Sequence, residues 1–347
     1  MTGAVGVGLV GYGMAAASLH VPLIGAEPRL ELRAVVSRDP AKVHRDLPAV
    51  PVVSSLDSLL AGPDVELVVV AAPSGVHHEL AAAALRAGRH VVVDKPMTVT
   101  VAEADELIAL SERYDRRLAA FHQRRWDSDH LSLSRCLAAG QLGRVSMYLS
   151  RYDRYRPHPV DRWRERDEPG AGLLYDLGAH LVDQALQLFG LPSTVTADVG
   201  TQRPGAVVDD YFHLVLGYGV LGHGPLRAIL HAGSLVLAPG PRLEVHGDQG
   251  SFVSGEIDGQ VAALLAGQRP GDEGWGESGG SASLTTVDGE RPAERVPGAY
   301  QTFYREMAAA VRGQGPVPVP AAEARDVVRV IECAQRSSAD GRTRPLR

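Results

Sequence analysis

The chain has 347 residues, of which 45% are hydrophobic and 22% charged, the balance of an ordinary globular protein. Its formal net charge of −6 argues against a general nucleic-acid binder, which needs a basic surface. No apolar stretch is long enough to span a bilayer, and residues 1–10 lack the basic start of a signal peptide.

This length suits two domains rather than one. The two cysteines, Cys136 and Cys333, lie far apart and form no CxxC pair. We therefore expect a cytoplasmic protein in a reducing compartment, with neither a structural disulfide nor a metal site.

The first predicted element is a buried strand, residues 5–10, which leads into a glycine turn and then a helix. This order is what a dinucleotide-binding βα unit requires. Gly11 permits a tight turn, Gly13 lets backbone approach a pyrophosphate, and Ala16 is small enough for close helix packing. The alternative is that small residues occur here by composition alone. The residues expected to contact the phosphates at the helix start are Gly11, Gly13, Met14 and Ala15.

The second predicted strand, residues 30–36, ends in Ser37 and Arg38, and Asp39 comes only afterwards. NAD-specific sites place an acid at the end of this strand, where it bonds the ribose 2′-hydroxyl. A hydroxyl and a guanidinium suit a 2′-phosphate better, so we predict NADP, bound by Ser37 and Arg38. In the alternative, Arg38 is a solvated loop residue, Asp39 turns back to the ribose, and the cofactor is NAD.

Further strands are predicted at residues 66–72, 91–93 and 117–122, with helices at 76–87 and 102–113 between them. This alternation indicates a parallel sheet wound on both faces, as in a Rossmann domain. Because Pro96 stops its strand, Lys95 lies at the carboxyl edge of the sheet, where ligands bind. There it can hold its ammonium against a reacting oxygen; the alternative is a solvated lysine that opens a loop.

After His122 the pattern changes, and we place the domain boundary there. Residues 1–122 are expected to bind the dinucleotide, and residues 123–347 to bind substrate and to form oligomers. Strand-like runs follow a helical start at 123–135, namely residues 145–155, 195–201, 210–218, 226–236 and 242–253. They indicate an α+β domain on a largely antiparallel open sheet. An apolar sheet face left uncovered predicts a homodimer or homotetramer.

The one clear helix among these strands, residues 176–189, carries Asp176 and His180 on one face, since they are four residues apart. A histidine backed by a carboxylate is an acid–base unit near neutral pH. A capped helix with a surface His–Asp pair is the alternative. Residues 169–172 before it are expected to be flexible. Later elements are a glycine-rich surface loop at 267–282, containing Trp275 and Glu277, and two helices at 300–311 and 321–336.

Together these motifs resemble the Gfo/Idh/MocA family of NAD(P)-dependent sugar and cyclitol oxidoreductases over nearly the whole chain. The shared marks are the glycine turn with His20-Val21-Pro22 after it, Pro73-Ser74 followed by His77, Asp94-Lys95-Pro96, and Asp176 with His180. Residues 121–127, 162–165, 175–181, 257–260 and 275–277 are similar to its NADP-linked scyllo-inositol dehydrogenase branch.

The resemblance implies that Lys95 bonds the hydroxyl being oxidised, that His180 takes its proton and that Asp176 orients the pair. A hydride then passes to the nicotinamide. It also implies cofactor contacts by Pro73, Ser74, His77, Asp94 and Lys95. Ser74 and Asp94 stand where the family often has Asn and Glu, which bears on ribose contacts. Gln123 stands where the branch often has Asn, which bears on substrate identity.

The sequence therefore predicts an NADP-dependent dehydrogenase or ketoreductase acting on a polyol, inositol or sugar. Alternatives are a nucleotide-sugar ketone or an aldose as substrate, or a cofactor-binding regulator without catalysis, against which Lys95, Asp176 and His180 argue. We expect the Lys95 ammonium and the His180 imidazole to converge on one cleft beside the nicotinamide. The residues predicted to contact substrate are Lys95, Arg125, Tyr155, Trp163, Arg164, Tyr175 and His180.

Overall fold

The computed structural model describes residues 3–222, 224–255, 257–277 and 279–347. The chain forms two compact units, each assembled from three segments. The first unit comprises Met1–Gln123, Gln260–Gly276 and Ala299–Arg325, and the second comprises Arg124–Gly259, Glu277–Gly298 and Asp326–Arg347.

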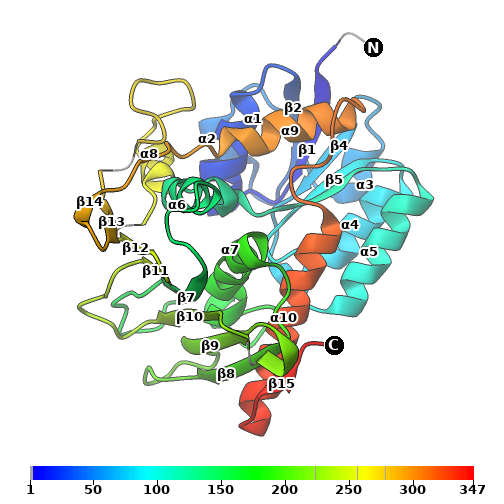
Figure 1. The fold of residues 1–347 in the computed structure, drawn as a ribbon. Coiled ribbons are helices and arrows are strands. Elements are labelled where there is room, and N and C mark those ends of the chain that lie inside the picture. Colours follow the sequence, from blue (N-terminus) through cyan, green and yellow to red (C-terminus); the bar gives the residue numbers. More distant parts are fainter. Residues whose placement is uncertain (1–2, 223, 256, 278) are drawn as a thin grey trace. The chain divides into compact units, whose positions relative to one another are not determined.

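The first unit is built on a six-stranded parallel sheet in the order β3-β2-β1-β4-β5-β6 (Figure 1). Its strands are β1 Val5–Val10, β2 Leu30–Val36, β3 Val52–Val53, β4 Leu67–Val70, β5 His90–Asp94 and β6 Leu118–Phe121. β1, β4 and β6 are buried over their full length, as expected for strands covered on both faces. The strand order reverses between β1 and β4, so this fold places its ligand site at their carboxyl ends.

Helices join these strands and confirm the predicted alternation of strands and helices. They are α1 Val21–Gly25, α2 Pro40–Asp46, α3 Leu56–Leu60, α4 His77–Arg86 and α5 Val101–Arg113, joined by α8 Gln260–Leu265 and α9 Gln301–Val311 from later in the chain. α9 belongs to this unit because it buries Phe303 and Tyr304, whose rings pack against Phe121 of β6. The compact unit thus runs beyond residue 122, and the predicted division of functions at that residue stays a prediction.

The second unit is built on a nine-stranded sheet in the order β14-β13-β12-β11-β7-β10-β9-β8-β15. Its strands are β7 Val145–Arg151, β8 Thr194–Gly200, β9 Tyr211–Gly217, β10 Arg227–Gly233, β11 Leu243–Gly247, β12 Gly250–Ser254, β13 Ala282–Thr286, β14 Gly289–Pro292 and β15 Arg344–Pro345. Among the described strands of this sheet, only β7 and β10 pair in parallel, so the prediction of a largely antiparallel sheet is confirmed. Along β9, buried and half-buried residues alternate, so one face lies in the core.

One strand prediction is wrong: residues 242–253 form a hairpin, β11 and β12, and not a single strand. The turn falls at Asp248 and Gln249, where Asp248 also accepts a hydrogen bond from the Arg144 backbone at 2.9 Å. Glycine is needed at the end of β11 for a close approach, because a Cβ on Gly247 would lie 1.9 Å from the carbonyl oxygen of Leu142.

The helices of this unit are α6 Ser128–Ala138, α7 Ala179–Phe189 and the part of α10 Ala321–Asp340 that starts at Asp326. A π-helical turn, Leu174–Gly178, directly precedes α7, so the predicted helix at 176–189 begins irregularly. No helix within the four described ranges is both long and apolar enough to cross a membrane.

Candidate functional site

The glycine turn after β1 lies at the carboxyl edge of the first sheet and has the geometry that a dinucleotide phosphate needs. Gly11 has φ +94°, and a Cβ on it would lie 2.5 Å from the carbonyl oxygen of Ala71. No atom lies within 4 Å of where a Cβ on Gly13 would be, so space is open above the turn. The helix begins at Met14, which is 58% exposed, and its first N–H groups have no acceptor within the helix. This edge therefore fits a pyrophosphate.

The segment after β2 is fixed by the start of α2. Asp39 caps this helix by accepting a hydrogen bond from the Lys42 backbone at 3.0 Å, and its own N–H donates to the Ser37 hydroxyl at 3.1 Å. Arg38 is exposed beside them. The Asp39 carboxylate thus serves the helix start, and the Ser37 hydroxyl also donates to the Asp39 carbonyl oxygen at 3.3 Å, so the exposed Arg38 is the side chain that remains for a ligand.

Lys42 is a residue that the sequence analysis missed. Its ammonium donates to the Tyr12 carbonyl oxygen at 2.9 Å, so its charge lies at the glycine turn. The chain has two lysines, Lys42 and Lys95, and both lie at the carboxyl edge of the first sheet. The position of Lys42 in the first turn of the helix after the second strand is the signal that would have found it.

Two segments, those that follow β4 and β5, are tied together by His77. Its Nδ1 lies 2.8 Å from the Pro96 carbonyl oxygen and its Nε2 lies 2.8 Å from that of Ala72. Burial lowers the pKa of His77. In the described chain, the buried Oγ of Ser74 has no hydrogen-bond partner. An orphaned hydroxyl at this edge is expected where a ligand completes the site, and a ribose hydroxyl would suit it.

Lys95 follows β5 directly and is only 8% exposed. Its backbone N–H donates to Asp94 Oδ1 at 2.9 Å. Below it, His20 Nε2 lies 4.0 Å from the same carboxylate oxygen, and His20 Nδ1 lies 2.6 Å from the Tyr304 hydroxyl. Burial lowers the pKa of His20 to about 4, so the ring is neutral at pH 7. Sequence reasoning gave His20 no role and did not single out Tyr304, because their shared burial is a tertiary feature.

In the second unit, Asp176 lies in the π-helical turn and His180 in the first turn of α7. Asp176 pairs with Arg164 at 3.1 Å, and His180 is buried. The start of this helical segment is held by Asp209, which accepts from the Leu174 backbone at 2.6 Å. Burial raises the pKa of Asp209 to about 6.

The segment before Asp176, which was predicted to be flexible, is closely packed at Gly172. Gly172 has φ +92°, and a Cβ on it would lie 2.0 Å from Asp209 Oδ1. Its glycine is therefore needed for a close approach to that carboxylate, which fixes the entry into the helix.

The predicted substrate residues of the second unit fall into different surroundings. Arg125 and Asp183 form a buried two-pronged ion pair, with distances down to 2.6 Å, so this guanidinium is committed within the protein. Tyr175 is buried and donates to Gln335 at 3.4 Å. Tyr155 is 54% exposed. Their roles toward substrate stay predictions.

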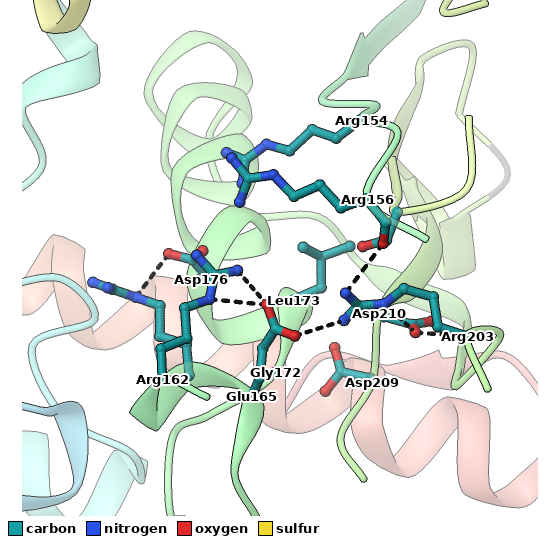
Figure 2. A pocket seen from close by; sticks show the side chains of 12 residues that line it. Arg154, Arg156, Arg162, Glu165, Gly172, Leu173, Asp176, Arg203, Asp209 and Asp210 are labelled. Atoms are coloured by element: carbon teal, nitrogen blue, oxygen red, sulfur yellow. Dashed lines mark hydrogen bonds and ion pairs between the residues drawn. The ribbon is translucent and has the colours of Figure 1, made fainter. Parts of the chain in front are cut away.

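One pocket of the second unit contains Asp176 and Arg164 (Figure 2). Arg164 also stacks on the ring of Trp163, with its guanidinium 4.6 Å from the ring centre. The pocket is lined by five arginines and four acids, which are Arg154, Arg156, Arg162, Arg164, Arg203, Glu165, Asp176, Asp209 and Asp210, together with Gly172, Leu173 and Ser234. No group of three or more His, Cys, Asp or Glu side chains in the described ranges is arranged to hold a metal ion.

Two family models match the chain. One, the oxidoreductase family with an NAD-binding Rossmann fold, matches residues 5–122; the other, the oxidoreductase family C-terminal alpha/beta domain, matches residues 134–346. The chain is 45% identical over 336 residues to the uncharacterized oxidoreductase YdgJ of Escherichia coli (strain K12), covering 96% of each chain. It is 41% identical over 343 residues to scyllo-inositol 2-dehydrogenase (NADP(+)) IolW of Bacillus subtilis (strain 168), covering 97% of this chain and 94% of that one.

Solved structures agree with this grouping. The structure of yvaA from Bacillus subtilis is 39% identical, with a TM-score of 0.95 over 100% of this chain and 99% of that one. The structure of YPO2259 from Yersinia pestis is 43% identical, with a TM-score of 0.93 over 100% and 98%.

Proposed function

The chain belongs to the Gfo/Idh/MocA oxidoreductase family, and from that premise we propose that it oxidises a secondary alcohol of a cyclitol or sugar with NADP. The observation that carries the proposal is the carboxyl edge of the first sheet. There the glycine turn, the unpartnered Ser74 hydroxyl and the buried Lys95 lie at the ends of neighbouring strands. A phosphate site, a hydroxyl for a ribose and a fixed ammonium are the parts that such a reaction requires.

The preference for NADP is part of the proposal. Asp39, the acid nearest to the end of β2, caps α2. Arg38 is exposed beside it, and the Lys42 ammonium lies at the glycine turn. Two cations and the Ser37 hydroxyl suit a 2′-phosphate, whereas recognition of a free ribose needs a carboxylate. The residues that would hold the cofactor are Gly11, Gly13, Met14, Ala15, Ser37, Arg38, Pro73, Ser74, His77, Asp94 and Lys95, with Lys42 added.

When bound, the cofactor supplies the hydride acceptor; the protein supplies placement and proton handling. Lys95 donates a hydrogen bond to the substrate oxygen and stabilises the negative charge that develops there as the hydroxyl proton leaves. His180 accepts that proton, and Asp176, held by Arg164, orients the exchange. Lys95 and His180 are each buried, and a low exposure strengthens the electrostatic interactions that each side chain makes.

The test is a panel of compounds offered with NADP or NAD while absorbance near 340 nm is followed. The panel holds scyllo-inositol, myo-inositol, common aldoses and nucleotide sugars. We expect reduction of NADP with at least one cyclitol or sugar, and a lower KM for NADP than for NAD. If reduced cofactor binds but no compound is oxidised, or no corresponding ketone reduced, the chain is a cofactor-binding regulator.

We also propose that the chain forms a homodimer or homotetramer through the sheet of the second unit. Its support is the half-buried alternate residues of β9, Tyr211, His213 and Val215, on the face opposite the core. Light scattering at micromolar concentration should give a dimer or tetramer mass. A monomer mass would contradict the proposal.

A further inference from the structure

The pocket around Asp176 contains two arginines that one extended segment places on the same side. After β7 the chain continues as an extended segment along residues 233–236: the Arg154 N–H donates to the Gly233 carbonyl at 2.9 Å, and the Arg156 N–H to that of Ser234 at 2.7 Å. Residues two apart on an extended segment point to the same face. Asp153, one position earlier, pairs with His231 at 3.3 Å and does not line the pocket.

The acids of this pocket are already engaged by the protein. Glu165 pairs with Arg162 at 2.6 Å and with Arg203 at 3.2 Å. Asp210 pairs with Arg203 at 2.8 Å. The remaining two carboxylates, those of Asp176 and Asp209, are held by Arg164 and by the Leu174 backbone, as described above. Arg162, Arg164 and Arg203 are therefore each paired with at least one of these acids.

Arg154 and Arg156 are the positive charges left over. Across residues 3–222, 224–255, 257–277 and 279–347, neither forms an ion pair with a carboxylate. Arg154 stacks over the Tyr152 ring at 4.6 Å. Burial lowers the pKa of Arg156, and the nearby charges of Arg154 and Arg162 lower it further, while the Asp176 and Glu165 carboxylates raise it. Two adjacent guanidinium groups repel each other, and a further anion held by both would offset that repulsion.

The shape of the pocket limits what that anion is. Figure 2 shows the side chains of Arg154 and Arg156 running side by side from one segment, with Asp176 below their guanidinium groups. About 20 Å³ is accessible to water, room for one or two molecules. A small planar group fits that space. A carboxylate matches the guanidinium fork with two parallel hydrogen bonds, whereas a neutral hydroxyl leaves the charge uncompensated.

We propose that Arg154 and Arg156 form a carboxylate-binding subsite beside Asp176, and that the physiological substrate is a sugar acid, such as a uronic acid. This inference rests on the proposed function, because it assigns the substrate class of the same site. The arginines hold the carboxylate, and the alcohol to be oxidised belongs to the same small molecule. Arg154 and Arg156 act on binding and take no part in proton transfer.

The experiment compares wild type with Arg156→Met, since Arg154 also supports Tyr152. Arg156→Lys tests whether charge alone suffices. Arg144→Met is the matched control, because its side chain is 72% exposed and outside the pocket. Thermal unfolding is measured without cofactor in the presence of D-glucuronate, D-galacturonate, D-glucose or D-glucose 6-phosphate. Steady-state NADP reduction is then measured with the same compounds and with scyllo-inositol.

We expect a uronate to raise the Tm of wild type and Arg144→Met but not of Arg156→Met, with Arg156→Lys intermediate. The KM for that uronate should rise about 10- to 100-fold in Arg156→Met, and kcat should change less. Without ligand, the Tm of Arg156→Met should not fall, since a like-charge neighbour is removed, and this shows that the variant folds.

The inference is overturned if Arg156→Met leaves the ratio of uronate to hexose binding unchanged, or if only D-glucose 6-phosphate raises the Tm. It is also overturned if scyllo-inositol is the only compound oxidised and all variants oxidise it at the same rate. In that last case the proposed function stands without the subsite. If a uronate stabilises the protein through Arg156 but no compound reduces NADP, the subsite stands and the dehydrogenase proposal fails.

Discussion

The two units present opposite kinds of binding surface. At the carboxyl edge of the first sheet, the expected binding groups are mostly backbone groups, at a glycine with positive φ and at a helix start. One buried ammonium, that of Lys95, adds a charge. In the second unit, the pocket around Asp176 is built almost entirely from charged side chains, five arginines and four acids. The first surface suits a dinucleotide, and the second suits a ligand that is recognised through its charge.

The difference teaches where specificity resides. Backbone N–H groups recognise any phosphate in the same way, so the first unit is expected to determine how tightly the cofactor binds. Side chains such as Arg156 differ in charge and reach, so the second unit is expected to determine which alcohol is accepted. Variants in the two units should therefore alter different kinetic constants.

Lys95→Met should have the largest effect on turnover. It is an exception to the division between cofactor binding in the first unit and substrate choice in the second, because Lys95 lies in the first unit but is proposed to act on substrate. We expect kcat to fall by about 1000-fold because the developing negative charge loses its ammonium. The Kd of NADPH, measured by fluorescence titration, should change by less than about 3-fold, because phosphate recognition lies elsewhere. Near-normal turnover would remove Lys95 from the mechanism.

His180→Gln should lower kcat by about 100-fold, with NADPH affinity kept, because the side chain can no longer accept a proton. Added imidazole should restore part of the rate, which a merely structural role would not allow. His231→Gln is the matched control: this histidine of the same unit pairs with Asp153 and lies outside the pocket. Equal losses in both variants would contradict a specific role for His180.

Asp209→Asn tests the support of the Asp176 segment through pH. Burial raises the pKa of Asp209 from 3.8 to about 6, so the folded state binds a proton that the unfolded state has released. The contribution of Asp209 to the free energy of unfolding is therefore largest below pH 3.8 and falls as the pH rises through 6, by about 3 kcal/mol. Asp209→Asn should lose this fall, as followed by urea unfolding between pH 4 and 8. The exposed Asp248→Asn should keep it, and identical pH profiles in all three proteins would refute the assignment.

Arg38→Ala should have the smallest effect and one confined to the cofactor. We expect KM for NADP to rise about 10-fold, with KM for NAD and kcat nearly unchanged, because one charged contact to the 2′-phosphate is lost. Lys42→Met should act in the same direction. The control is Arg33→Ala, which removes an exposed arginine of β2 that pairs with Glu31. Equal effects on NADP and NAD would favour the ribose-binding alternative through Asp39.

The strands of the first unit other than β3 could be predicted because they are short runs rich in apolar residues: residues 5–10 and 30–36 have the bounds of β1 and β2. α9 could not be assigned to this unit, since its packing against Phe121 joins residues far apart in sequence. In the hairpin of β11 and β12, the two-residue turn at Asp248 and Gln249 was missed, although Gly247 and Gly250 flank it.

The candidate site shows the same contrast. Lys95 and the glycine turn could be located because strand ends fix their position. The pocket of the second unit could be located only in part: Asp176 and Arg164 were predicted, but an extended segment leaves open which alternate residues face the ligand. Tyr155 was chosen, while Arg154 and Arg156 line the pocket. Arg125 is bound to Asp183, a pairing between residues 58 apart that spacing does not indicate.

The most direct test of the central claim, that Lys95 and His180 act on the same hydroxyl, is a double-mutant cycle on kcat with the best substrate and NADP. If both residues act in one proton-transfer step, the kcat of the double variant should lie within about 3-fold of the kcat of Lys95→Met alone. If the separate losses multiply, or if neither variant slows the reaction, the two residues do not share a step and the account is wrong.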